Sequence, residues 1–107
     1  MKNEIIEINS ELGGTLRSSS SLDFAEDRTS KEKNIYKKLA YFIRAIVVDH
    51  PFDDMNKSTA TIFTTRELER NDINFNLESL QRAIKKIAKN NISNLNTIES
   101  MIRRTKI

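Results

Sequence analysis

The clearest hydrophobic pattern in the chain lies within residues 30–49 and predicts one long helix. Its apolar side chains recur at intervals of four, three, one and three positions, which places them on one face of an α-helix. These side chains are Ile35, Leu39, Phe42, Ile43 and Ile46. Tyr36, Ala40 and Val47 widen this face. So wide an apolar face predicts a central, buried helix with neighbours on more than one side.

Local signals predict where this helix begins and ends. Thr29 and Glu32 have the spacing of a capping box, which predicts a start near residue 30. Pro51 predicts the end, because the residue before a proline avoids the α conformation. We therefore expect His50 at the C-terminal end of the helix or just beyond it.

Three further patterns predict helices after the proline. The first begins near Asn56 or Lys57 and ends near Arg70, with a thin apolar face. The second covers residues 77–90. Its N-cap is expected at Asn76, and a pairing of Asn96 with Glu99 predicts the cap of a last helix.

The first 20 residues are more polar. Residues 5–8 alternate between apolar and acidic side chains, which is the pattern of a brief strand, and a mobile arm is the other interpretation of this segment. Ser20 with Asp23 three residues later predicts the start of a short helix. We accordingly divide the chain into an N-terminal arm, residues 1–20, and a helical domain, residues 21–107.

The fold class follows from these patterns and from the scarcity of residues that interrupt helices. The 107 residues include only two glycines and one proline. We therefore expect an all-α single domain of about five or six helices. The residues expected in its core are Leu39, Phe42, Ile43, Ile46, Phe52, Phe63, Leu80, Ile84 and Ile98.

Composition excludes several classes of site. The chain has no cysteine, which excludes disulfides, a thiolate nucleophile and zinc–thiolate sites. No apolar run approaches the roughly 20 residues that span a bilayer, and the N-terminus lacks the features of a signal peptide. We expect a cytoplasmic protein that has no membrane contact. The net charge of +3 is a weak basic excess, which disfavours a dedicated nucleic-acid binder.

Candidate chemistry is concentrated in residues 50–60, between two predicted helices. His50 is the only histidine in the chain and could exchange a proton near neutral pH. Asp53 and Asp54 could hold a hard cation such as Mg²⁺. The backbone N–H groups at the start of the following helix could bind phosphate. Such a combination suits phosphate transfer, although an exposed histidine beside a solvated turn has the same composition.

The order of residues in this stretch resembles the signature of the Fic/Doc family, His-x-Phe-x-Asp/Glu-Gly-Asn-Gly/Lys-Arg-x-x-Arg. Five residues match it in register: His50, Phe52, Asp54, Asn56 and Lys57. Residues 21–28 also resemble the leader segment of the Doc-like, death-on-curing branch. The resemblance covers roughly residues 15–107 and implies a Fic-like helical domain.

The resemblance implies an enzyme that uses ATP and Mg²⁺ to modify a hydroxyl group of a protein. Most members transfer AMP, and the Doc type transfers a phosphate. The implied roles are general base for His50, Mg²⁺ ligand for Asp54, phosphate contacts for Asn56, Lys57 and Ser58, and anchoring of the loop for Phe52. The family's inhibitory segment is absent, so a toxin held by a separate antitoxin partner is implied.

Two departures from the signature bear on activity. Met55 replaces the glycine that lets the backbone turn closely around phosphate. Ser58 replaces an arginine that contacts the nucleotide phosphates, and a charge-assisted hydrogen bond is lost with it. A second arginine of the signature falls at Thr61, a position where Doc-like members often lack it.

Two other functions therefore remain open. One is a degenerate protein that keeps the Fic fold for interaction and transfers nothing. The other is a helical DNA-binding module, because the helices around residues 90–93 superficially resemble a helix-turn-helix and Arg103, Arg104 and Lys106 form a basic tail. The basic side of residues 82–89 is either a phosphate-facing patch or a solvated helix face.

Overall fold

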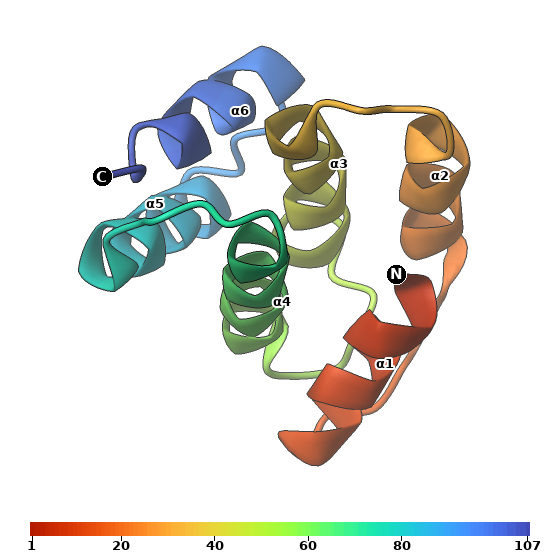
Figure 1. Ribbon diagram of the computed structural model, residues 1–107. Coiled ribbons are helices and arrows are strands. Elements are labelled where there is room, and N and C mark those ends of the chain that lie inside the picture. Colours follow the sequence, from red (N-terminus) through yellow and green to blue (C-terminus); the bar gives the residue numbers. More distant parts are fainter.

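The computed structural model describes all 107 residues and contains six α-helices (Figure 1). They are α1 (Lys2–Glu11), α2 (Ser20–Thr29), α3 (Ile35–Val47), α4 (Asn56–Arg70), α5 (Leu77–Lys89) and α6 (Leu95–Arg103). Extended pairing is limited to two isolated antiparallel bridges. The all-α prediction is confirmed. None of the helices is both long and apolar enough to cross a membrane.

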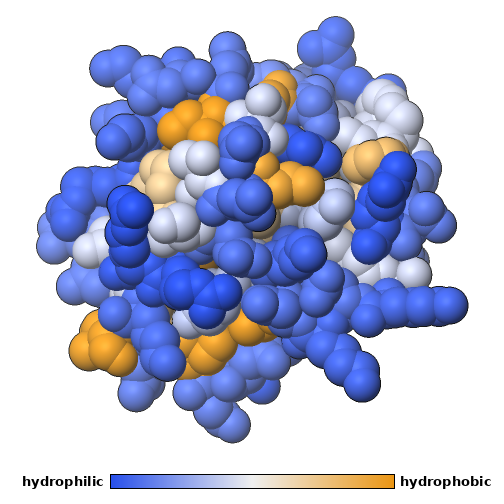
Figure 2. Space-filling model, turned by 90° about the horizontal axis from the view of Figure 1, so that it is seen from above, coloured by the Kyte–Doolittle hydropathy of each residue, from blue (hydrophilic) through white to orange (hydrophobic).

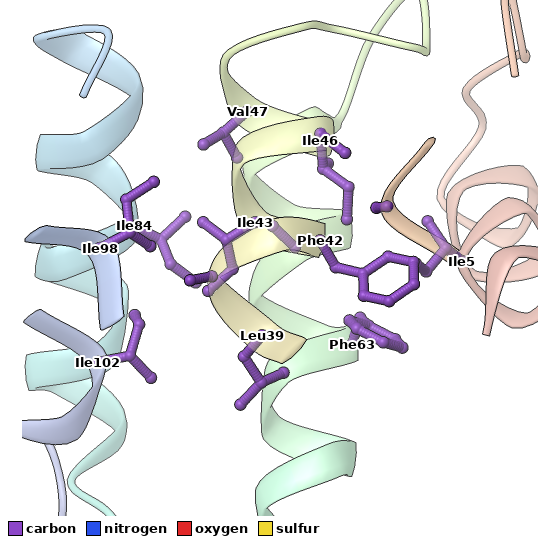
Figure 3. Close-up of a cluster of buried hydrophobic side chains, with 14 of the residues drawn as sticks. Ile5, Leu39, Phe42, Ile43, Ile46, Val47, Phe63, Ile84, Ile98 and Ile102 are labelled. Carbon is purple, nitrogen blue, oxygen red and sulfur yellow. The ribbon is translucent and has the colours of Figure 1, made fainter. Parts of the chain in front are cut away.

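Helix α3 lies at the centre of the molecule and contacts α2, α4, α5 and α6 (Figure 1). Figure 3 shows Ile43 pointing from α3 toward Ile84 and Ile98. Phe42 points to the other side, where its ring centroid lies 5.5 Å from that of Phe63. The wide apolar face thus has neighbours on several sides, as the sequence predicted.

The predicted core is also confirmed. All nine residues expected there are buried, and none is more than 2% exposed. Hydrophilic side chains cover most of the surface seen from above, where hydrophobic atoms form only small separate areas (Figure 2). The hydrophobic effect therefore acts mainly through the one cluster around α3.

The N-terminal segment differs from the predicted strand, because residues 2–11 form helix α1. Ile5 and Ile8 are three positions apart, so a helix turns both to the same side, and both are buried. The helix packs against α4. Glu4 adds a paired contact, accepting hydrogen bonds from both terminal nitrogens of Arg70 at 2.8 and 2.6 Å.

Two predicted caps are wrong because nearby asparagines cap the helices instead. Thr29 is the last residue of α2, and its hydroxyl donates to Ala25 O at 2.8 Å. Helix α3 begins later, where Asn34 Oδ1 accepts from the backbone N–H groups of Tyr36 and Lys37. Similarly, α6 is capped by Asn94 rather than by the pair that begins at residue 96. Asparagine is among the strongest N-cap residues.

The other predicted helix limits lie within two residues of those observed. Helix α4 begins at Asn56 and ends at Arg70 as predicted. Asn76 caps α5, and its side chain accepts from the backbone N–H of Ser79 at 2.8 Å. Helix α3 ends at Val47, so His50 lies beyond it in the connection to α4.

Candidate functional site

The connection between α3 and α4 is held in place by residues 15–18 on one side. Leu16 forms an antiparallel bridge with Phe52. Asp53 N–H donates to Thr15 O at 3.0 Å, and Thr15 N–H donates to the Asp53 carboxylate at 2.7 Å. Pro51 O accepts from two further backbone N–H groups of the segment. The Asp53 side chain is therefore engaged in holding the loop.

Phe52 and Asn56 fix the shape of the loop from inside. The Phe52 ring is buried in the core. The Asn56 amide donates to Phe52 O at 3.0 Å, and its oxygen accepts from Phe52 N–H at 3.3 Å. The same amide nitrogen lies 3.5 Å from His50 Nδ1. Both ends of the Asn56 amide are thus used within the loop, and a phosphate would have to compete with these bonds.

Asn9 of α1 is hydrogen-bonded to the loop and to α4, and the sequence did not identify it as part of the site. It is buried, and its amide nitrogen donates to Asp54 O at 2.9 Å and to Thr59 Oγ1 at 3.1 Å. A Cβ at Gly14 would collide with the Asn9 amide, so only glycine leaves room for it. The helical periodicity of Ile5, Ile8 and Asn9 was the one available signal.

The loop, the start of α4 and the end of α5 enclose an open cleft of about 530 Å³. Its lining consists of His50, Asp53, Asp54, Met55, Asn56, Lys57, Ser58, Lys85, Ala88 and Lys89. The structure thus brings together every predicted site residue except Phe52, which lies beneath the loop. Lys85 and Lys89 join them from α5.

The cleft contains unused hydrogen-bond donors. The backbone N–H groups of Asn56, Lys57 and Ser58 have no acceptor in the protein. The first paired N–H of α4 is that of Thr59, which donates to Met55 O at 2.9 Å. Open N–H groups at the start of a helix carry partial positive charge and favour an anion.

Charged side chains border the same cleft without neutralising one another. The ammonium groups of Lys57, Lys85 and Lys89 form no ion pair, and neither do the carboxylates of Asp53 and Asp54. Three cations and two anions around one open cleft suit a ligand that carries several negative charges, alone or with a metal ion.

A metal ion would depend on ligands that the protein does not supply alone. No three His, Cys, Asp or Glu side chains converge anywhere in the structure. One Asp54 oxygen accepts from Met55 N–H at 2.7 Å, and the carboxylate is exposed. Mg²⁺ usually keeps several waters and binds one or two carboxylates together with substrate phosphates. Asp54 fits that pattern when a nucleotide brings the phosphates.

Met55 adopts the left-handed conformation that glycine favours, with φ 65° and ψ 24°. The turn into α4 therefore forms without a glycine, and the half-buried methionine side chain borders the cleft. His50 is also left-handed, with φ 51°. Ser58 presents a hydroxyl and no positive charge.

Comparison with known proteins adds no further assignment. No protein-family model matches the chain, and no curated protein matches it.

Proposed function

We propose that the protein binds ATP with Mg²⁺ in the cleft and transfers part of the nucleotide to a hydroxyl group of a protein, as Fic/Doc-like enzymes do. One observation carries the proposal. Four of the five residues that match the signature, His50, Asp54, Asn56 and Lys57, line a single cleft at the open N-terminus of α4, where free N–H groups and three lysines favour phosphate.

In this proposal each group has a defined task. His50 takes the proton from the attacking hydroxyl, whose oxygen forms a bond to phosphorus. Attack at the α phosphorus releases pyrophosphate and leaves AMP on the protein, whereas attack at the γ phosphorus releases ADP. Asp54 holds Mg²⁺, which neutralises phosphate charge when it is bound. Lys57 and the N–H groups of Asn56 and Ser58 hold the phosphates.

The two departures from the signature set the expected level of activity. A lost charge-assisted hydrogen bond, as at Ser58, is worth about 1.5–3 kcal/mol. Lys85 and Lys89 offset part of that loss, because they place two other positive charges on the cleft. Met55 also lines the cleft, where its side chain takes up room that a glycine would leave to a phosphate. We therefore propose weak activity, with Lys57 favouring the Doc-type phosphate transfer over AMP transfer.

A specific observation also favours the second candidate, a Fic-fold interaction protein without catalysis. Both ends of the Asn56 amide bond the backbone of Phe52 and are not free for a phosphate. A degenerate site of this kind would keep the fold and bind a partner. In either case we propose a cytoplasmic component of a toxin–antitoxin pair, with the antitoxin as a separate protein.

The deciding experiment uses ATP labelled at the α or the γ phosphate in a cell lysate. Transfer of the α label to protein indicates AMP transfer, and transfer of the γ label indicates phosphorylation. Either signal must disappear in His50→Ala. Restoring Met55→Gly and Ser58→Arg together should raise the signal.

Binding separates the two candidates. Calorimetry with ATP and Mg²⁺ should detect binding to the wild type if the cleft is a nucleotide site. If the restored double variant neither binds ATP nor labels any protein, the enzyme proposal is wrong. Specific binding of DNA by the wild type would then favour the DNA-binding module.

A further inference from the structure

A strip of basic side chains runs beside the cleft, along α5 and onto the end of α6. Its members are Arg82, Lys85, Lys86, Lys89 and Arg104, and all five are exposed. The first four line one open hollow. Arg82, Lys86 and Arg104 line a second hollow, and Lys85 with Lys89 also lines the cleft. The strip is therefore continuous from α6 to the mouth of the cleft.

The charges of this basic strip are not neutralised within the protein. No member lies within 4.0 Å of a carboxylate, whereas Arg66, Arg70 and Arg103 all form ion pairs. Glu78 lies one turn before Arg82 but forms no pair with it. The Arg82 guanidinium donates only to the Ser79 hydroxyl, at 3.4 Å. The five charges thus repel one another and remain available to an outside anion.

The strip holds more positive charge than the whole chain carries as its net charge. The basic strip carries five positive charges, but the whole chain carries only +3, so the rest of the protein has a net charge of −2. A long polyanion that reached beyond the strip would meet a mixed surface, on which the other 13 basic residues are outnumbered by 15 acidic ones. A short anionic segment confined to the strip would meet positive charge only.

We propose that the basic strip binds an acidic segment of a partner protein. On α5 the cations lie between Arg82 and Lys89, about 10 Å along the helix, which about three residues of extended peptide would cover, and Arg104 at the end of α6 extends the strip further. The side chains between the cations are small or flexible, as Ala83 and Met101 are, and no aromatic ring is available to stack on bases. Charge complementarity therefore favours a run of Asp and Glu over a nucleic acid.

The test uses a fluorescent peptide of about ten residues with six glutamates and a matched peptide with glutamine at those six positions. Anisotropy should show that the wild type binds the acidic peptide and not the glutamine peptide. Raising the ionic strength from about 0.05 to about 0.3 M should weaken binding strongly, because screening acts on exposed charges.

Charge reversal on the protein locates the binding surface. Arg82→Glu with Lys86→Glu should weaken binding of the acidic peptide by about tenfold or more. Lys31→Glu with Lys33→Glu makes the same change of charge in the exposed loop between α2 and α3, away from the strip, and should change the affinity less than about threefold. Arg82→Gln with Lys86→Gln provides a milder version of the first variant, and unchanged melting confirms that each variant is folded.

Three results would overturn the proposal. The first is that the wild type does not bind the acidic peptide. The second is that both charge-reversal variants lose the same affinity. The third is that a single- or double-stranded oligonucleotide binds more tightly than the peptide at equal ionic strength. The proposed function is tested separately, because Arg82 and Lys86 lie outside the cleft and ATP binding does not require them.

Discussion

Met55 holds a left-handed backbone conformation although it carries a Cβ. The conformation costs a residue with a Cβ about 1–2 kcal/mol, and glycine does not incur that cost. Two bonds keep the turn in place: Asp54 accepts from Met55 N–H, and the Thr59 hydroxyl donates to Met55 O. The strain is therefore offset by local hydrogen bonds.

This strain predicts that position 55 tolerates glycine better than alanine. Both Met55→Gly and Met55→Ala remove the methionine side chain beyond Cβ. Only Met55→Gly also removes Cβ, and with it the strain. Met55→Gly should be more stable than Met55→Ala by about 1 kcal/mol, after allowing for the greater freedom of glycine in the unfolded chain. Urea unfolding of the two variants measures the difference. A more stable alanine variant would contradict the assigned conformation.

Asn9 is the buried residue that ties α1 to the candidate site. Asn9→Ala would leave Asp54 O and Thr59 Oγ1 without this donor, and an unsatisfied buried group costs about 1–3 kcal/mol. We therefore expect a loss of about 2 kcal/mol in the free energy of unfolding. Asn3→Ala on the exposed side of the same helix is the control and should stay within about 0.5 kcal/mol of the wild type.

At the scale of elements, α1 is attached to α4 mainly by Ile5, Ile8 and a charged network. Glu4 pairs with Arg70 at 2.6 Å and with Arg66 at 3.5 Å. The hydrogen bond from Arg70 is the largest cause of the lowered pKa of Glu4, which falls below its ordinary value of 4.5. Glu67, which is buried, accepts from Arg70 at 2.6 Å as well.

The lowered pKa of Glu4 predicts how the attachment depends on pH. Because the folded state holds this proton less tightly than the unfolded state, the stabilisation is full above pH 4.5 and is lost as the pH falls through the lowered value. The site is partly exposed, so Glu4→Gln should cost only about 0.5–1 kcal/mol at pH 7. The difference from wild type should shrink toward zero in acid. Glu7→Gln, which removes an unpaired exposed carboxylate of the same helix, is the control and should stay within about 0.5 kcal/mol of the wild type at pH 7.

The limits of the helices show which elements the sequence could predict. The start of α5 was accessible because the Asn76 cap coincides with the apolar pattern, and Pro51 showed that α3 ends before the loop. Helix α1 was not accessible, because residues 6–8 fit the alternation of a short strand, and the helical pair Ile5 and Ile8 covers only one turn. The early start predicted for α3 was wrong because Thr29 bonds within α2 and Asn34 caps α3 instead.

At the scale of the whole molecule, stability depends on the core around α3. Leu39 is 1% exposed and belongs to the hydrophobic core cluster. Leu39→Ala should lower the free energy of unfolding by about 2–5 kcal/mol. A denaturant midpoint equal to that of the wild type would show that the α3 face is packed differently.

The candidate site could be predicted only in part, because some of its residues are neighbours in the sequence and others are far apart. The loop residues are consecutive, so sequence alone suggested that His50, Asp54 and Lys57 lie together. Lys85 and Lys89 follow some 30 residues later, and only the packing of α5 against α4 brings them to the same cleft. Their spacing on α5 predicts one exposed face but not what that face meets.

The last prediction concerns Lys85 and Lys89, which lie on α5 but line the same cleft as the loop before α4. If the cleft holds the phosphates of ATP, Lys85→Gln with Lys89→Gln should weaken ATP binding, because two unpaired ammonium groups leave its wall. An exposed charge contact contributes up to about 1 kcal/mol, so the two together should lower the affinity by about tenfold. Lys31→Gln with Lys33→Gln removes two charges elsewhere and should leave the affinity within about twofold of the wild type. Titration calorimetry with ATP and Mg²⁺ measures all three proteins. Equal affinities for all three would place the nucleotide away from α5 and exclude the cleft as its phosphate site.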